Sequence, residues 1–190
     1  DLWWKYFITT NPYNLGSDSL IFTHPKVLES SGHLKNFHDW LIECLNCQKR
    51  YRLDNLISAE QFTSFLTKEN KQGFATKNCP HCGRSKFTNP RQFNLLLSSD
   101  LQITDQGEEN IVYLRPETCQ GIFINFTAIQ RSTRKKLPFG VGQIGKSFRN
   151  EITPGNSVFR TLVFEHAEIE YFFDPETTKW EPLFEEWKKS

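Results

Sequence analysis

Four cysteines in the sequence stand in two pairs of identical spacing. Cys44 and Cys47 form one C-x-x-C pair, and Cys79 and Cys82 form the other. A C-x-x-C turn directs two thiolates at a point about 2.3 Å away, and two such turns complete the tetrahedron that Zn²⁺ prefers. Four thiolates leave no coordination position open, so the spacing predicts a structural zinc site. Two disulfides or four unconnected thiols are the alternative.

The segment between the two pairs is expected to have structure of its own. It contains about 31 residues, more than the 15 to 20 of a typical zinc ribbon. Ser58-Ala-Glu-Gln61 has the form of a capping box, and Phe62, Phe65 and Leu66 follow at helical spacing. We therefore expect a helix here, within a small zinc-bound insertion.

A second set of chemical groups lies in residues 148–172, whose pattern predicts a strand, a long loop and a second strand. Side chains alternate between the two faces of a strand, so Arg149 and Glu151 share one face of the first arm. The turn formers Thr153-Pro-Gly-Asn156 begin the loop, and Arg160 stands where the chain returns. In the second arm one face carries Phe164, His166, Glu168 and Glu170, and the other carries Ala167, Ile169, Tyr171 and Phe173.

The polar face of this strand pair carries groups that suit ATP beside an amino acid. A guanidinium binds a phosphate through two hydrogen bonds, a phenyl face stacks on a purine, and a pair of carboxylates receives an ammonium group. Glu168 and Glu170 repel each other and Phe164 is exposed unless a ligand covers them. The alternative is a solvated sheet face with ion pairs between strands. The apolar face is expected to pack on helices.

Another carboxylate, Glu117, stands at a predicted helix start. Pro116 opens the helix, and Ile122, Phe126 and Ile129 recur at i, i+4 and i+7. A carboxylate at this position either complements the helix dipole or lies in a binding pocket, and the loop sequence alone leaves both interpretations open. Cys119, close by, is interpreted as a small buried residue.

The remaining elements must position these groups. Residues 93–97 and 111–114 are expected to be apolar strands that bracket a polar turn at 105–109. Residues 2–8 have the pattern of the end of an amphipathic helix, and residues 20–22 that of a short buried strand. With 190 residues, the chain has the length of one large domain or two small ones.

Charge and hydropathy exclude several classes of protein. Lys and Arg number 23 against 22 Asp and Glu, so the net charge of +1 provides no global attraction for nucleic acid or an acidic membrane. No run of about 18 uncharged apolar residues is present, and the first residues lack the pattern of a signal peptide. We expect a cytoplasmic protein with no membrane partner. The sequence contains no Met, which is typical of a fragment of a longer protein.

An ordered series of motifs resembles the class II aminoacyl-tRNA synthetases, and among these the dimeric bacterial and eukaryotic type of glycyl-tRNA synthetase. The resemblance covers nearly the whole chain. It rests on Trp3-Trp-Lys-Tyr-Phe7, Pro25-Lys-Val-Leu-Glu-Ser-Ser-Gly-His-Leu34, the two C-x-x-C pairs, Leu114-Arg-Pro-Glu-Thr-Cys-Gln-Gly-Ile-Phe123, Arg134-Lys-Lys-Leu-Pro-Phe-Gly140 and Phe148-Arg-Asn-Glu-Ile-Thr-Pro-Gly155.

The resemblance implies an α+β fold in which a six-stranded antiparallel sheet is flanked by helices. Residues 1–40 would begin the catalytic domain, from the end of the motif 1 helix onward. Residues 41–90 would form the zinc insertion, and residues 91–190 the catalytic sheet with motif 2. The chain would stop before motif 3 and the anticodon-binding domain, so the fragment alone is expected to lack part of the active site.

The resemblance also implies an activity: glycine and ATP form glycyl-adenylate, and the glycine passes to tRNA(Gly). Mg²⁺ would accompany ATP, and the full-length protein would be a homodimer. Arg149 would be the catalytic residue and would grip the α-phosphate. The ATP site would also include Asn150, Glu151, Phe159, Arg160 and Phe164. The glycine site would comprise Glu117, Phe164, Glu165, Glu168 and Arg50.

Two departures qualify this expectation, and three alternatives remain, one of which is a synthetase of another amino-acid specificity. The family usually has Arg and Glu where this chain has Leu162 and Val163, next to the expected ATP site. Cys119 stands where Ala is common. A non-catalytic synthetase-like accessory protein would keep the fold without the activity. A zinc-containing RNA-binding module would use the basic residues at 49–52 and 131–136.

Overall fold

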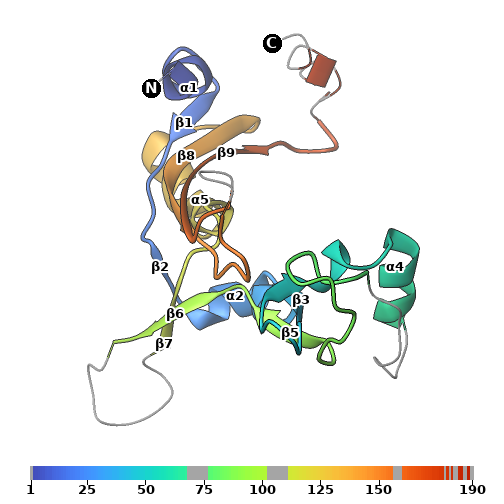
Figure 1. The fold of residues 1–190 in the computed structure, drawn as a ribbon. Coiled ribbons are helices and arrows are strands. Elements are labelled where there is room, and N and C mark those ends of the chain that lie inside the picture. Colours follow the sequence, from blue (N-terminus) through green and yellow to red (C-terminus); the bar gives the residue numbers. More distant parts are fainter. Residues whose placement is uncertain are drawn as a thin grey trace. The chain divides into compact units, whose positions relative to one another are not determined.

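The computed structural model describes residues 2–67, 77–101, 111–155 and 160–177, together with 179, 181, 184, 185 and 188. The chain divides into two compact units (Figure 1). Unit 1 takes residues 1–23, 115–147 and 165–190, and unit 2 takes residues 24–114 and 148–164. Each unit has its own hydrophobic core.

Unit 1 is built around a three-stranded sheet in the order β1-β8-β9. Its helices and strands are α1 (Leu2–Trp4), a π-helix η1 (Lys5–Thr9), β1 (Asn14–Gly16), β2 (Phe22–Thr23), α5 (Cys119–Thr133), β8 (Phe139–Phe148) and β9 (Val163–Phe172). The last residue of β8 and the first two of β9 are assigned to unit 2. β1 pairs with β8 in parallel, with Asn14 opposite Gly140. This parallel pair differs from the wholly antiparallel sheet that the resemblance implies.

The core of unit 1 confirms the apolar face predicted for α5. Ile122, Phe139 and Val141 are fully buried, and Phe126 and Ile129 pack against them. The ring of Phe126 lies 4.4 Å from that of Phe172 at the end of β9. Phe172 belongs to the same alternating set of β9 as Glu168, so this face packs on a helix. The sequence predicts that the apolar face of β9, the one with Ile169, packs on helices. That prediction is incomplete, because Phe172 on the other face also packs on a helix.

The N-terminal part of unit 1 follows the sequence only in part. A helical segment covers residues 2–9, as the amphipathic pattern predicts, and Ile8 is its buried residue. The buried strand predicted at residues 20–22 is wrong. Leu20 is 84% exposed and Phe22 is 51% exposed, and the strand covers Phe22–Thr23. Three apolar residues are too short a run to show burial, since no periodicity can be read from them.

Unit 2 contains a second three-stranded sheet, in the order β4-β3-β5, and an antiparallel pair of β6 and β7. β3 pairs antiparallel with both of its neighbours. The bounds are α2 (Pro25–Ser30), α3 (His33–Asn36), β3 (His38–Glu43), β4 (Arg50–Arg52), a 3₁₀ turn η2 (Leu53–Asn55), α4 (Ala59–Thr67), β5 (Arg91–Asn94), β6 (Leu97–Asp100) and β7 (Ile111–Leu114). The strand predicted at 93–97 is thus two strands. The polar turn predicted at 105–109 lies outside the described residues.

The core of unit 2 forms where β3 meets the helix predicted between the cysteine pairs. Ile42, Leu53, Leu56, Ile57 and Phe65 form this buried cluster. The capping box of α4 is confirmed in both directions. The Ser58 backbone N–H donates to Gln61 Oε1 at 2.9 Å, and the Gln61 backbone N–H donates to Ser58 Oγ at 3.3 Å. Leu66, by contrast, is 49% exposed.

The structure confirms a mixed α and β architecture with antiparallel strand pairs. The class II synthetase fold, the zinc insertion and the boundaries 1–40, 41–90 and 91–190 stay predictions. Within the described parts of the chain, no helix has the length and hydropathy to cross a membrane.

Candidate metal centre and substrate-binding groups

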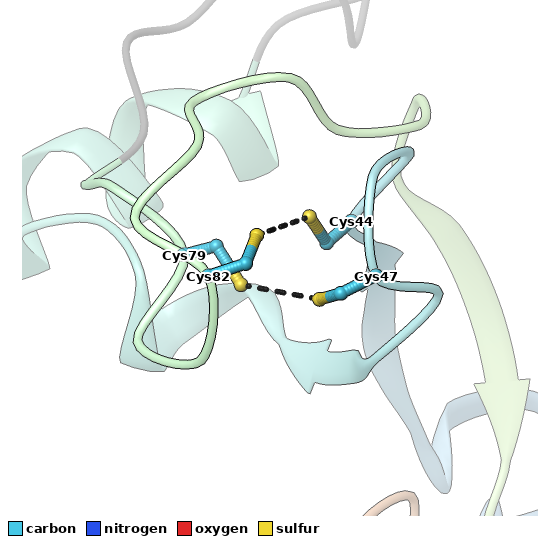
Figure 2. A group of neighbouring side chains, drawn as sticks. All are labelled: Cys44, Cys47, Cys79 and Cys82. Carbon is cyan, nitrogen blue, oxygen red and sulfur yellow. Dashed lines mark hydrogen bonds between the residues drawn. The ribbon is translucent and has the colours of Figure 1, made fainter.

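The four paired cysteines converge on one point in unit 2 (Figure 2). The Sγ atoms of Cys44 and Cys82 are 3.6 Å apart, and so are those of Cys47 and Cys79. A disulfide requires about 2.05 Å, and all four thiols are free. In a tetrahedron with arms of about 2.3 Å, neighbouring sulfurs are about 3.8 Å apart. The spacing of the sulfurs therefore fits a Zn²⁺ ion, and the disulfide alternative is wrong.

Both cysteine turns have the same backbone geometry. In the first, the Gln48 N–H donates to the carbonyl oxygen of Cys44 at 2.9 Å; in the second, the Gly83 N–H donates to that of Cys79 at 2.8 Å. Gln48 and Gly83 both have positive φ, of 57° and 71°. This left-handed residue folds each turn back, so that its two thiols lie on the same side. Two independent turns of one shape are the geometry of a built metal site.

The pKa values of the thiols also bear on cation binding. Burial opposes ionisation of Cys79, yet hydrogen bonds from Tyr51 Oη and from the backbone outweigh it and lower the pKa of Cys79 to about 6. The hydrogen bond to Cys79 raises the pKa of Tyr51 to about 12. Although the Lys49 backbone favours the Cys47 thiolate, burial and the sulfur of Cys79 raise the pKa of Cys47 to about 12. Cys47 therefore ionises at neutral pH only when a cation compensates its charge.

Glu168 of β9 holds the start of helix α5 in unit 1. Its Oε2 accepts hydrogen bonds from the backbone N–H of Thr118, at 2.9 Å, and from the Thr118 hydroxyl. Thr118 is fully buried at the N-cap position of α5. The other oxygen, Oε1, lies 3.5 Å from Nε2 of His166. A carboxylate in this position complements the positive end of the helix dipole.

Glu117 lies beside Glu168 and also belongs to the start of α5. Its Oε1 accepts hydrogen bonds from Gln120 Nε2, at 2.6 Å, and from Cys119 Sγ, at 3.1 Å. Donor atoms of Glu117, Cys119 and Glu168 all lie within 4.8 Å of one another. The structure thus brings together the two carboxylates that the sequence assigns to an ammonium group.

Negative charge accumulates on this face of unit 1. Burial, together with the charges of Glu168 and Glu117, raises the pKa of Glu170 above its ordinary value. Burial and the hydrogen bond to Glu117 also raise the pKa of the Cys119 thiol, which therefore stays protonated at neutral pH. The face gains from a positively charged ligand, since such a ligand compensates several carboxylates at once.

The loop that carries Glu117 is fixed by a buried arginine. Arg115 is 5% exposed, and it donates from Nε to the Lys146 carbonyl and from Nη1 to the Ser19 carbonyl, both at 2.8 Å. A Cβ added to Gly145 would lie 2.1 Å from Arg115 Nη2, so the absence of a side chain at Gly145 makes room for the guanidinium. Arg115 therefore connects the start of the Glu117 loop to strand β8 and to the segment between β1 and β2.

Arg149 lies just beyond β8, in unit 2, and two phenyl rings accompany it. Its guanidinium carbon is 5.1 Å from the centroid of the Phe164 ring and 5.5 Å from that of the Phe37 ring. Its backbone N–H donates to the Leu162 carbonyl at 3.0 Å. β8 ends at Phe148, so Arg149 and Glu151 lie in the loop and not on the extended first arm that the alternation predicts.

The other residues expected at the ATP site lie near Arg149 in the chain. The Asn150 backbone N–H donates to the Leu95 carbonyl at 2.8 Å. Arg160 Nε is 3.9 Å from a carboxylate oxygen of Glu151. The Gly155 backbone N–H donates a hydrogen bond to the Arg160 carbonyl oxygen. Phe159 lies outside the described residues.

Two residues assigned to glycine are engaged elsewhere. Arg50 is largely exposed and pairs with Glu43 on the neighbouring strand, with Nε to Oε2 at 3.1 Å. Glu165 is 71% exposed in its side chain and pairs with Lys146 at 3.1 Å. The assignment of both residues to a substrate stays a prediction.

Sequence reasoning missed three residues that organise these groups. They are Thr118, which binds Glu168; Arg115, which fixes the Glu117 loop; and Phe37, whose ring lies against Arg149. Thr118 follows Glu117 directly and Arg115 stands two residues before it. An Arg before Pro is only a weak sequence signal for a buried anchor. Phe37 is more than a hundred residues from Arg149 along the chain, so no local pattern connects them.

Comparison with known proteins finds similar sequences that extend over almost the whole chain. No protein-family model matches. The chain is 50% identical over 186 residues to a glycine-tRNA ligase of Mycoplasma mycoides, which covers 94% of this chain and 40% of that protein. Glycine-tRNA ligases of Lachnoclostridium phytofermentans and Geobacillus thermodenitrificans are each 46% identical, over 98% of this chain and 42% of their own length.

The chain spans about two fifths of the length of the curated relatives that it matches. The region aligned with these relatives extends over nearly all residues of the chain, so it includes both units. The chain is therefore homologous, over almost its entire length, to a segment of the glycine-tRNA ligases.

Proposed function

We propose that this chain forms part of the catalytic region of an ATP-dependent glycine-tRNA ligase. The observation that carries the proposal is the convergence of Glu117 and Glu168 at the start of α5, in a chain 45 to 50% identical to proteins of that name. The non-catalytic accessory protein and the RNA-binding module are not favoured by these relatives.

In the proposed reaction, a carboxylate oxygen of glycine attacks the α-phosphorus of ATP. The bond from that phosphorus to the bridging oxygen breaks, and pyrophosphate leaves with the electron pair. The nucleophile is already ionised, so no general base is required. Catalysis then consists of positioning the reactants and stabilising negative charge on the phosphoryl oxygens.

Arg149 would provide that charge stabilisation. Its guanidinium suits two oxygens of a phosphate, and removing such a donor costs on the order of 10²-fold or more in rate. Phe164 would stack on adenine, Glu151 would lie near the adenine amino group, and Arg160 would approach the triphosphate. Asn150 and Phe159 would also belong to the ATP site. Mg²⁺ would accompany the phosphates. Leu162 and Val163 would leave fewer polar contacts to ATP than the family usually has.

The ammonium group of glycine would lie between Glu117 and Glu168, which already have hydrogen-bond donors on their other sides. Two carboxylates beside the ammonium group would bind any α-amino acid, so this contact alone would not select glycine. Selection of glycine requires in addition a pocket too small for a methyl group, because a clash excludes a larger substrate more easily than weak contacts exclude a smaller one.

The four cysteines would hold a structural Zn²⁺ ion, with Cys44, Cys47, Cys79 and Cys82 as its ligands. The ion would join the two chain segments that carry the cysteine pairs, and would take no part in the reaction. Further proposals follow from the relatives' name and from the family: tRNA(Gly) as the acceptor, a homodimer for the full-length protein, and a cytoplasmic location.

The test is amino-acid-dependent ATP-pyrophosphate exchange by the full-length protein that contains this chain. We expect exchange with glycine and at least about 10²-fold less with alanine or serine. A preference for alanine or serine would show a synthetase of another specificity. The absence of exchange with any amino acid, in a folded and metal-loaded protein, would contradict the proposed function.

A further inference from the structure

We propose that Phe37 is a positioning residue for Arg149, which it holds in place through its ring and through a backbone connection by way of Leu95. The inference rests on the proposed function, because Arg149 is the group that would bind the α-phosphate. Phe37 belongs to the turn between α3 and β3, more than a hundred residues before the segment 148–172 that the sequence assigns to ATP.

The first observation is the pair of rings at the guanidinium. Arg149 Cζ lies over both the Phe37 ring and the Phe164 ring, at 5.5 and 5.1 Å from their centroids. Both distances are within the range of about 6 Å in which a cation is attracted to a ring face. A planar guanidinium that contacts two rings loses rotational freedom before a ligand arrives, so less entropy is lost when it binds phosphate.

The second observation is a backbone connection that links the same residues. The Leu95 N–H donates to the Phe37 carbonyl at 3.2 Å, and the Asn150 N–H donates to the Leu95 carbonyl at 2.8 Å. Asn150 is the residue after Arg149. The chain at Arg149 is therefore held to Phe37 twice, once through the backbone of Leu95 and once through the ring.

The two rings have different expected roles when ATP binds. Phe164 would stack on adenine, so its ring would then contact both the base and the Arg149 guanidinium. Phe37 has no such second partner in the proposed site, so its contact with Arg149 persists during binding. Phe37 packs against His33 of α3, with 5.1 Å between the ring centroids, which fixes its own orientation.

The proposal predicts a specific kinetic effect. Phe37→Leu keeps an apolar side chain but removes the ring face, so we expect the KM for ATP to rise roughly 3- to 10-fold. The KM for glycine should change less than about 2-fold, because the carboxylates that would bind it are in unit 1. Phe37→Tyr keeps the ring face and should restore the KM for ATP.

The experiment measures ATP-pyrophosphate exchange by the full-length protein in four variants. They are Phe37→Leu, Phe37→Tyr, Arg149→Ala and Phe62→Leu. Phe62→Leu is the control, because it replaces a partly buried ring that packs against the core of unit 2 in α4. Thermal unfolding of Phe37→Leu and Phe62→Leu gives the general cost of losing a ring. Phe62→Leu should leave the KM for ATP unchanged.

The outcomes separate this proposal from the proposed function. If Arg149→Ala retains full exchange, the role of Arg149 is wrong, whatever Phe37 does. If Arg149→Ala loses exchange while Phe37→Leu keeps the parent KM for ATP, the positioning role of Phe37 is overturned. Equal rises in the KM for ATP and for glycine, or no rescue by Phe37→Tyr, would also overturn it, since they indicate a general loss of structure.

Discussion

The carboxylate of Glu168 accepts two hydrogen bonds from one residue, the backbone N–H and the hydroxyl of Thr118, fifty positions earlier in the chain. This contact joins strand β9 to the start of helix α5. It also directs the same carboxylate toward Glu117. One side chain therefore serves both the stability of unit 1 and the proposed ammonium site.

Thr118→Val tests the structural part of this relationship. The substitution keeps the shape of the side chain but removes the hydroxyl donor, and hydrogen bonds to charged groups contribute about 1.5 to 3 kcal/mol. We expect urea unfolding to show a loss of about 1 to 3 kcal/mol. Thr127→Val, at an exposed position of α5, is the matched control and should change stability by less than about 0.5 kcal/mol. Equal effects of the two variants would contradict the role of the Thr118 hydroxyl.

Arg115→Lys tests the anchor of the Glu117 loop. A lysine ammonium is a single point charge and cannot reproduce donation from Nε to Lys146 and from Nη1 to Ser19 at once. We expect a loss of about 1.5 to 3 kcal/mol in the free energy of unfolding, because a part-buried hydrogen bond from a charged donor is lost. Arg131→Lys, at an exposed position in the last turn of α5, should have little effect. A stability of Arg115→Lys equal to that of the parent would show that this guanidinium does not fix the loop.

The cysteine cluster predicts one tightly bound zinc ion per chain. Cys47→Ser should reduce the zinc content, measured by atomic absorption after dialysis, from about one to less than about 0.2 per chain. The midpoint of thermal unfolding should fall by more than about 5 °C, since metal binding contributes directly to folding. Cys119→Ser is the control and should keep its zinc. Full zinc content in Cys47→Ser would rule out the four-cysteine site.

Glu170 predicts a pH-dependent change in stability. Burial and the charges of Glu168 and Glu117 raise its pKa in the folded state, so its favourable contribution is present below the ordinary pKa and is lost as the pH rises through the folded pKa. Glu170→Gln should therefore be more stable than the parent at pH 7, by less than about 1 kcal/mol because solvent screens the charge. The difference should vanish near pH 4. Glu29→Gln, at an exposed position of α2, is the control for loss of a surface charge. A difference between Glu170→Gln and the parent that stays constant with pH would contradict the electrostatic cause.

The sequence predicts best the features that are encoded locally. The capping box of α4, the apolar face of α5 and the two C-x-x-C turns each follow from spacings of a few residues, and the structure confirms the first two and the convergence of the four thiols. The pairing of Glu117 with Glu168 needed more, because it joins a helix start to a distant strand. The family resemblance provided that link, and the strand alternation alone did not.

The features that the sequence could not predict depend on contacts between distant segments. Phe37 meets Arg149, and β1 joins β8 in parallel, through packing that no local period encodes. Phe22 is exposed although its neighbours are apolar, since burial depends on what covers a residue and not on its hydropathy alone. Arg149 and Glu151 lie outside the strand because β8 ends at Phe148, one residue before Arg149 and three before Glu151, a boundary that alternation does not determine.

Glycine-dependent exchange of pyrophosphate into ATP is the most direct test of the proposed function. The measurement compares the full-length protein with its Arg149→Ala variant, each with and without glycine, after both are shown to be folded and to contain zinc. We predict exchange that requires glycine in the parent and falls by about 10²-fold or more in the variant. Exchange that is equal with and without glycine, or equal in the two proteins, would contradict the account.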